Sequence, residues 1–394
     1  MQREPPLRTP VPPPDHVLWQ LGFRPFYLAA STFAALSIAL WTAQHAGWIA
    51  GAYLAGAIWH AHEMLFGFTL AVMVGFLLTA GQNWSGRPTL SGTPLKALLL
   101  LWVAGRVLVL TPFGWAAALV NAAFPLAAAL ALAIPFVAAR NRRNYFFVAL
   151  LVLLACANAA VHLAQLKVVR LPEWLGIRVA LDIVLFIMAV MSGRVIPMFT
   201  NNGVAGAGAE RNDSIEKMAL ASLLALLAAD LMRLEGEPMA VVAVVAAGMH
   251  TLRAALWRPW KTLAVPIVWI LHAAYLWIPV HLALRAMAEM GMAPTNLATH
   301  ALSVGAIGGL TIGMMTRTAR GHTGRPLSAD RWEIACYVLI LCAALVRVLV
   351  PLVAPASYLA SVRLSGVLWS AGFALYAVRY WPVLTRARID GRPG

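Results

Sequence analysis

Long runs of apolar residues, broken by short polar segments, organise almost the whole chain. A helix needs roughly 20 apolar residues to cross the hydrocarbon core of a bilayer. Twelve such runs follow one another, and none of the gaps is long enough for a soluble domain. The pattern predicts an all-α polytopic membrane protein of about twelve transmembrane helices. The predicted spans are residues 25–46, 58–81, 95–112, 115–138, 145–166, 174–198, 215–234, 238–256, 262–285, 296–318, 331–353 and 357–381.

Composition supports this class of protein. The 394 residues are 61% hydrophobic and only 11% charged, which is far from an ordinary soluble domain. The net charge of +15 does not indicate nucleic-acid binding, because the charges separate apolar runs instead of forming a basic face. The three cysteines form no CxxC pair, so neither a disulfide framework nor a thiolate zinc site is predicted.

Lysine and arginine are distributed unequally between the two sides of the predicted membrane. Twenty lie on the side of both termini, and the opposite loops offer only five: Lys167, Arg170, Arg178, Arg233 and Arg285. Positive residues concentrate in cytoplasmic segments, so both termini are expected to be cytoplasmic. The proline-rich residues 1–24 lack the apolar core of a signal peptide. We expect a cytoplasmic tail over 1–24, a transmembrane domain over 25–382 and a second cytoplasmic tail over 383–394.

This topology places most histidines at one depth. The outer third of the membrane would contain His45, His60, His62, His162, His281 and His300, with His272 at mid-span and His322 in a cytoplasmic loop. An ionisable residue inside a bilayer needs a partner, a metal or water. Imidazole suits haem iron, copper and zinc, and the lack of thiolate ligands favours iron and copper. Hydrogen bonding between helices is the alternative role for each histidine.

Several neighbours of these histidines could complete a site. Glu63 lies three residues after His60, so on a helix it could orient that imidazole or relay protons. Trp269, His272 and Tyr275 recur at the same spacing, which suits either an aromatic wall beside a flat macrocycle or ordinary packing. Three outer-third arginines could bind haem carboxylates or pair with Asp182, Asp230 or Glu63; they are Arg106, Arg347 and Arg363.

Two segments of the chain resemble each other. Ser85-Gly86-Arg87-Pro88 begins 23 residues after His62, and Thr323-Gly324-Arg325-Pro326 begins 23 residues after His300. A weaker third copy ends near Gly193-Arg194 and Asn201-Asn202. The spacing is compatible with three four-helix units around a pseudo-threefold axis, and repeated transporter halves are the alternative explanation.

Several motifs resemble those of the NnrS family, and the resemblance runs almost end to end. The matching blocks are Leu21-Gly22-Phe23-Arg24-Pro25-Phe26, Trp59-His60-Ala61-His62-Glu63-Met64-Leu65-Phe66-Gly67, Asn83-Trp84-Ser85-Gly86, Gly193-Arg194-Val195-Ile196-Pro197-Met198-Phe199-Thr200-Asn201-Asn202, Leu271-His272 with Tyr275, and His300 through His322-Thr323-Gly324-Arg325-Pro326.

The resemblance implies a bacterial inner-membrane protein that carries haem (of b type) and copper and acts in the nitric oxide response or in protection against nitrosative stress. It makes His60, His62, His162, His272 and His300 the candidate metal ligands. Glu63, Tyr275, Trp269 and His281 become possible neighbours of the metals. The cytoplasmic set of Arg194, Asn201, Asn202, His322 and Arg325 is expected to close the inner ends of two spans.

The expected partners are nitric oxide and the lipid bilayer, with quinol as a possible electron donor and no nucleic acid. Two other functions stay open. One is a quinol-dependent oxidoreductase similar to nitric oxide reductases, although no extended acidic proton path and no soluble electron-entry domain is visible. The other is a transporter of a metal or a small solute, in which the histidines form a transient site.

Overall fold

Helices form every regular element of residues 17–391, the part of the chain that the computed structural model describes; the side chain of His45 lies outside this description. The expected all-α fold is therefore confirmed for these residues. The helical segments are α2 (Phe23–His45), α3 (Gly56–His62), η1 (Glu63–Thr69), α4 (Leu70–Ser85), α5 (Gly92–Leu108), α6 (Gly114–Ala138), η2 (Arg142–Asn144), α7 (Tyr145–Gln165), α8 (Leu175–Gly203), α9 (Asp213–Leu231), α10 (Glu237–Leu256), η3 (Pro259–Lys261), α11 (Pro266–Tyr275), α12 (Trp277–Glu289), α13 (Thr295–His300), η4 (Ala301–Gly308), α14 (Gly309–His322), α15 (Arg331–Val353), η5 (Pro355–Ser357) and α16 (Tyr358–Thr385).

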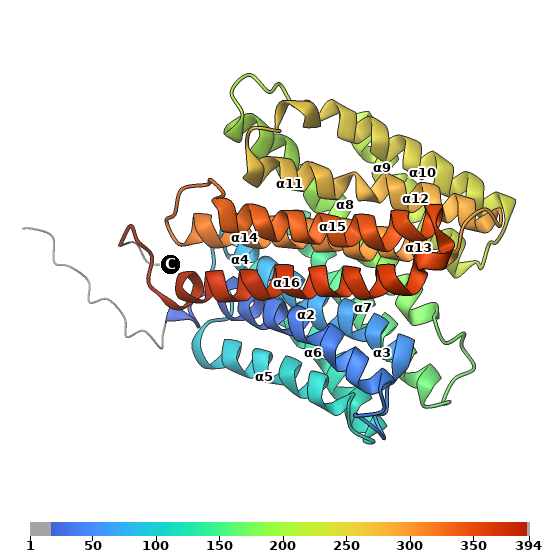
Figure 1. The fold of residues 1–394 in the computed structure, drawn as a ribbon. Helices are drawn as coiled ribbons and strands as arrows, with labels where there is room; N and C mark the ends of the chain where they lie inside the picture. Colours follow the sequence, from blue (N-terminus) through green and yellow to red (C-terminus); the bar gives the residue numbers. More distant parts are fainter. Residues whose placement is uncertain (1–16, 392–394) are drawn as a thin grey trace, which may run out of the picture.

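Ten of the helices in residues 17–391, several of them built from consecutive segments, are long and apolar enough to cross a membrane. Ten of the twelve predicted spans correspond to them. The other two correspond to α5, which has 17 residues, and α9, which has 19. At 1.5 Å per residue, α5 is about 26 Å long, slightly less than the roughly 30 Å hydrocarbon core. Figure 1 shows both helices lying alongside the others.

The outer surface of the bundle is apolar where a soluble protein would be polar. Large side chains on four different helices are more than half exposed, among them Leu100, Leu130, Val244 and Val367. Exposed apolar surface of this extent marks contact with lipid or a partner. Together with the ten apolar helices, it identifies an integral membrane protein.

The first and last helices are neighbours, so the bundle closes on itself. α16 packs along both α15 and α2, and the Trp369 indole N–H donates to the Ala34 carbonyl at 3.1 Å. At the other end of the same pair, Arg24 donates to the Leu384 carbonyl at 2.9 Å. The start of α2 and the end of α16 therefore lie at one end of the bundle (Figure 1).

The predicted tails correspond only partly to described structure. Residues 1–16 lie outside the described residues, and α2 already begins at Phe23, inside the predicted N-terminal tail. α16 continues to Thr385, a few residues beyond the predicted end of the transmembrane domain.

Candidate functional site

Two π-helical segments begin directly after the candidate ligands His62 and His300. α3 ends at His62 and η1 follows, while α13 ends at His300 and η4 follows. Both segments continue as α-helices that lead to left-handed glycines, Gly86 at φ 64° and Gly324 at φ 75°. The two similar stretches of sequence thus fold in the same way. π-Helical turns are rare and occur often at functional sites.

The first group of polar residues, which we call the His62 cluster, is buried between η1, α5, α6 and α7. His62 Nδ1 lies 2.8 Å from Glu63 Oε1, and His62 Nε2 lies 3.1 Å from Asn158 Oδ1. Arg106 donates to the same Glu63 oxygen at 2.7 Å. Its other terminal nitrogen donates to Asn121. Glu63 therefore links the His62 imidazole to the Arg106 guanidinium.

His162 completes the His62 cluster and has the least satisfied ring in it. Its imidazole packs edge-on against that of His62, with ring centroids 4.9 Å apart, and stacks on Tyr53 at 5.7 Å. Both ring nitrogens of His162 are buried and have no hydrogen-bond partner. A buried polar atom without a partner is costly, so this ring is suited to a ligand that supplies the missing bond.

Tyr53 holds His162 from the loop before α3. Its hydroxyl donates to the His162 backbone carbonyl at 3.1 Å while its ring stacks on the imidazole. Burial raises the pKa of Tyr53 to about 12, so the hydroxyl keeps its proton and remains a donor at neutral pH. Tyr53 was not predicted from the sequence, because it lies in a loop outside every recognised motif.

A second group, the His300 cluster, lies between α3, α13 and α15. His300 is within electrostatic range of both His60 and Arg347. His300 Nδ1 lies 2.7 Å from the Asn296 carbonyl, so this nitrogen carries the proton and Nε2 keeps its lone pair. A backbone bond of this kind is the usual way to orient a metal-binding imidazole. His60 packs against Trp41 with ring centroids 4.8 Å apart, and its Nδ1 is buried without a partner.

His281 has the same arrangement as His300. Its Nδ1 lies 2.7 Å from the Ala298 carbonyl, and its Nε2 is buried without a partner. The ring interacts electrostatically with Arg285 and Asp230. Arg285 forms an ion pair with Asp230 and lies 3.5 Å from Asp182. A third buried polar group therefore exists on α8, α9 and α12.

Of the residues predicted to form an aromatic wall, His272 and Tyr275 both contact the Trp257 ring, whereas Trp269 faces another neighbour. Tyr275 lies 2.6 Å from His250 Nδ1 and accepts from Arg253 at 3.1 Å. Trp269 instead packs on Tyr337, and His272 Nε2 lies 2.7 Å from the Thr200 hydroxyl. Equal spacing on α11 therefore brought only two of the three side chains, His272 and Tyr275, to a common neighbour. His272 Nε2 therefore already has a protein partner.

The three arginines predicted for the outer third of the membrane have different surroundings. Arg106 pairs with Glu63, which is the alternative to carboxylate binding that the sequence left open. Arg347 donates to the Tyr358 hydroxyl at 3.3 Å, and its Nη1 is buried without a partner. Arg363 is exposed on α16. Arg347 Nη1 and Arg106 Nε are therefore buried donors without a partner, and of these two side chains only that of Arg347 has no carboxylate beside it.

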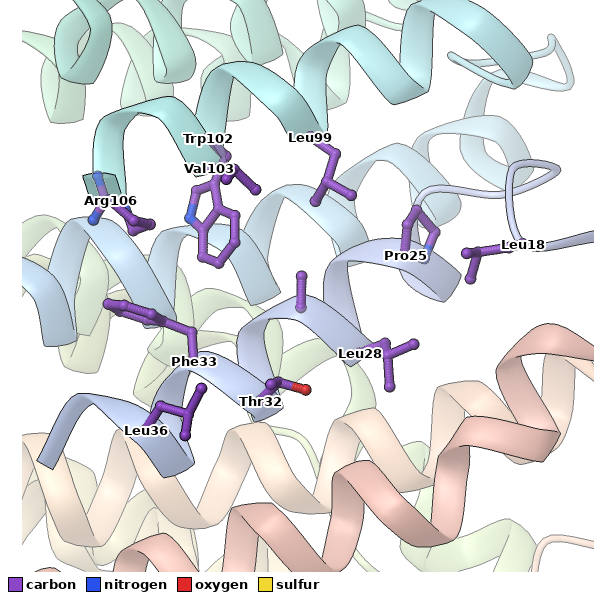
Figure 2. Close-up of a pocket in the computed structure, with 11 residues that line it drawn as sticks. Leu18, Pro25, Leu28, Thr32, Phe33, Leu36, Leu99, Trp102, Val103 and Arg106 are labelled. Carbon is purple, nitrogen blue, oxygen red and sulfur yellow. The ribbon is translucent and has the colours of Figure 1, made fainter. Parts of the chain in front are cut away.

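An apolar cavity of about 360 Å³ lies next to the His62 cluster, between α2 and α5 (Figure 2). Leu18 and Pro25 mark one end, and Arg106 marks the other. Leu36, on its wall, is 55% exposed, so the cavity opens toward the lipid-facing surface. Arg106 thus separates a membrane-accessible cavity from Glu63 and His62.

The five residues of the predicted cytoplasmic set each have different neighbours. Arg194 donates to Asn144 at 2.9 Å and lies over the rings of Trp84, Phe146 and Phe147. Asn201 exchanges two hydrogen bonds with the backbone of Ala209, and Asn202 is exposed. The His322 ring lies against Phe23. Arg325 lines a polar cavity near the end of α16.

Sequence reasoning missed the amides that connect these clusters. The Asn158 side-chain oxygen accepts from His62 Nε2, and its amide nitrogen donates to the Asn121 backbone carbonyl at 3.1 Å, while the Asn121 side chain accepts from Arg106. Asn296 donates to Tyr358 at 3.1 Å. The available signal was an asparagine inside an apolar run, since such residues must find partners within the membrane.

The donor set fits haem iron or copper, although it does not form a preassembled cage. Within residues 17–391, no group of three or more His, Cys, Asp or Glu side chains could hold a metal ion. The free nitrogens of His60, His162 and His281 are nevertheless buried imidazole donors without partners. Haem needs only one or two such ligands.

The fold and these clusters define the class: a polytopic helical membrane protein with histidines buried among its spans. The chain belongs to the NnrS family, since the family model described as NnrS protein matches residues 17–388. The comparison with individual curated proteins gives no match.

Proposed function

We propose that this protein binds haem and copper through the His62 and His300 clusters and acts on nitric oxide, as a binding or protective protein of the bacterial inner membrane. Its membership of the NnrS family, which is associated with haem and copper, supports this function. The observation that carries the proposal is the set of buried imidazole nitrogens without partners. When bound, haem iron or copper would supply a coordination position for nitric oxide.

The residues of the chain would hold and orient these groups. His60 and His300 are the proposed ligands of one group, and His162 is the proposed ligand of the other. His62 would join His162 as a ligand by exchanging its contact with Asn158 for the bound group. The Asn296 carbonyl fixes the His300 tautomer, and Glu63 with Asn158 holds His62. Arg347 has a free donor for a carboxylate of the bound group. The role of His272 as a metal ligand stays a prediction.

We further propose twelve spans arranged as three four-helix units, with both termini in the cytoplasm. Counting α5 and α9 as spans gives twelve spans, and leaving them out gives ten. Both numbers are even, so the two termini lie on the same side of the membrane in either case. The closed contact between α16 and α2 and the matching π-helical segments support the repeated arrangement.

The test is to purify the protein in mild detergent after growth with ample iron and copper. We expect both metals and a haem absorption spectrum that shifts when nitric oxide is added to the reduced protein. His300→Ala and His162→Ala should each lower the content of haem or copper. His322→Ala, at the opposite membrane edge, is the matched control and should keep both. Full metal content in the first two variants would contradict the site.

A quinol-dependent oxidoreductase is the second candidate function, and one observation favours it. The cavity beside Arg106 opens toward lipid and is connected to His62 through Glu63. Steady consumption of nitric oxide with a quinol analogue would establish turnover. A colourless protein without either metal would instead favour a transporter.

A further inference from the structure

A second cavity, which is polar, lies at the end of the bundle where α2 begins and α16 ends. It has a volume of about 220 Å³ and is remote from the histidine clusters in the proposed function. Its polar lining consists of Arg320, Arg325, Glu333, Arg379, Tyr380 and Arg386. We call it the arginine pocket. Arg325 belongs to one of the motifs shared with the family, and the role of this motif is not explained by the metal site.

The arginine pocket contains more positive charge than its carboxylates balance. Arg320 pairs with Glu333 at 2.7 Å, and Arg379 pairs with Asp330 at 2.6 Å. Within residues 17–391, no carboxylate pairs with Arg325 or Arg386. Arg325 and Arg386 therefore carry two positive charges that no described carboxylate in or beside the pocket balances.

Arg325 is the least satisfied side chain of the pocket. Its Nη1 is buried and has no hydrogen-bond partner. Burial, together with the nearby Arg320, Arg379 and Arg386, lowers the pKa of Arg325. A guanidinium that is crowded by other cations and lacks a partner costs free energy, and an anion between these side chains would remove that cost.

Arg24 does not line the pocket, but it adds positive charge next to it. It is fully buried at the start of α2, where its Nη1 donates to the Leu384 carbonyl at 2.9 Å and to the Arg386 carbonyl at 3.0 Å. Its Nε and Nη2 have no partner, and it is within electrostatic range of Arg325. These backbone bonds fix the segment that carries Arg386.

The loop after α14 is also fixed before any ligand binds. Gly324 is left-handed, and a Cβ there would lie 2.7 Å from the Asp390 carboxyl carbon. Arg388 donates to Asp390 and also to the His322 carbonyl at 2.9 Å. Arg325 is therefore presented by a loop whose backbone is tied to the end of the chain.

We propose that the arginine pocket binds a phosphate group. Guanidinium forks match phosphate oxygens with paired hydrogen bonds, and a group with up to two negative charges balances the excess. Because the pocket lies at the end of the spans, the phosphate can belong to the headgroup of an anionic phospholipid or to a soluble compound.

Thermal unfolding of the full-length protein in a neutral detergent tests this site. One series adds inorganic phosphate, with sodium chloride at equal ionic strength as the reference. The other adds phosphatidylglycerol to the micelles, with phosphatidylcholine as the reference. We expect Tm to rise in at least one series. A rise with the lipid alone identifies a headgroup site, and a rise with inorganic phosphate alone identifies a soluble ligand.

Three variants separate a specific site from general surface charge. Arg325→Gln and the exposed Arg386→Gln should each weaken the apparent affinity by about tenfold or more, as expected for the loss of a charge-assisted bond. Arg87→Gln is the matched control, since Arg87 holds the equivalent position in the other repeat but is exposed outside the pocket. No rise in either series, or equal weakening in all three variants, would overturn the proposal.

Discussion

At the scale of single residues, the sequence predicted the identities of most clustered side chains but not their partners. His62, Glu63, His162 and His300 were found because ionisable residues inside apolar runs are conspicuous. Glu63 was expected to orient His60 and instead contacts His62, because Arg106 on another helix holds its carboxylate. Partners on separate helices depend on packing, which local spacing does not determine.

The buried Arg106–Glu63 pair allows a prediction of stability. Arg106→Met leaves the Glu63 carboxylate without its cation, and loss of one partner of a buried pair costs about 3–5 kcal/mol. We expect a clear fall in the free energy of unfolding in detergent. The double variant Glu63→Gln/Arg106→Met removes both charges and should lose less than the sum of the single changes. Strict additivity would show that the two side chains do not interact.

At the scale of helices, apolar runs predicted where the spans lie, but they could not predict the π-helical segments. Hydropathy is continuous through η1 and η4, and the extra residue per turn is set by contacts with other helices. The clearest contacts are made by glycines. A Cβ on Gly67 would lie 2.6 Å from Arg106 Nη1, and one on Gly305 would collide with the Trp277 ring.

Alanine at either glycine should therefore strain its π-helical segment. Gly67→Ala and Gly305→Ala are expected to destabilise the protein by about 1–3 kcal/mol, the usual range for overpacking. They should also lower metal content, because His62 and His300 directly precede these segments. Gly248→Ala is the control, since a Cβ there meets nothing within 4 Å. Wild-type Tm and metal content in the first two variants would contradict the tight fit.

The start of α15 gives a pH-dependent contribution to stability. Asp330 accepts from the backbone of Trp332 and Glu333 in a capping box. Although burial opposes ionisation, hydrogen bonds from Arg379 and the backbone lower the pKa of Asp330 to about 2. This stabilisation is present above the unfolded pKa of about 3.9, and it is lost as pH falls from about 4 toward 2.

Asp330→Ala should remove this contribution. We expect a loss of about 1 kcal/mol at neutral pH, typical of a helix cap, and a difference from wild type that shrinks as pH falls below about 4. Denaturation followed by circular dichroism between pH 3 and 7 measures both effects. Asp330→Asn keeps a cap acceptor and should lose less. A difference that does not depend on pH would contradict the role of the charge.

At the scale of the whole molecule, the class of fold followed from the apolar runs and the composition, whereas the arrangement of the helices did not. Apolar runs indicate that α2 and α16 are spans, but not that they are neighbours. That contact depends on specific pairs such as Trp369 with Ala34, which lie 335 residues apart. For the same reason, the sequence did not predict which residues meet in the His62 and His300 clusters, because their members come from spans far apart in the chain.

The proposed topology can be tested with reporter fusions. Green fluorescent protein at the C-terminus should fluoresce, because it folds in the cytoplasm. Alkaline phosphatase inserted after Val168 should be active, because that loop is expected to lie on the side that has fewer positive residues in total. The same enzyme inserted after Arg87 should be inactive. Activity at both insertion points would exclude the proposed orientation.

Closure of the bundle between α2 and α16 also constrains how the protein is made. The first span enters the membrane when almost the entire chain is still to be synthesised, and its neighbour α16 arrives last. His60 is likewise synthesised well before His300, which lies some 240 residues later in the chain. Insertion must therefore leave early helices incompletely packed. Any group held between His60 and His300 can be loaded only after the chain has been made and inserted as far as His300.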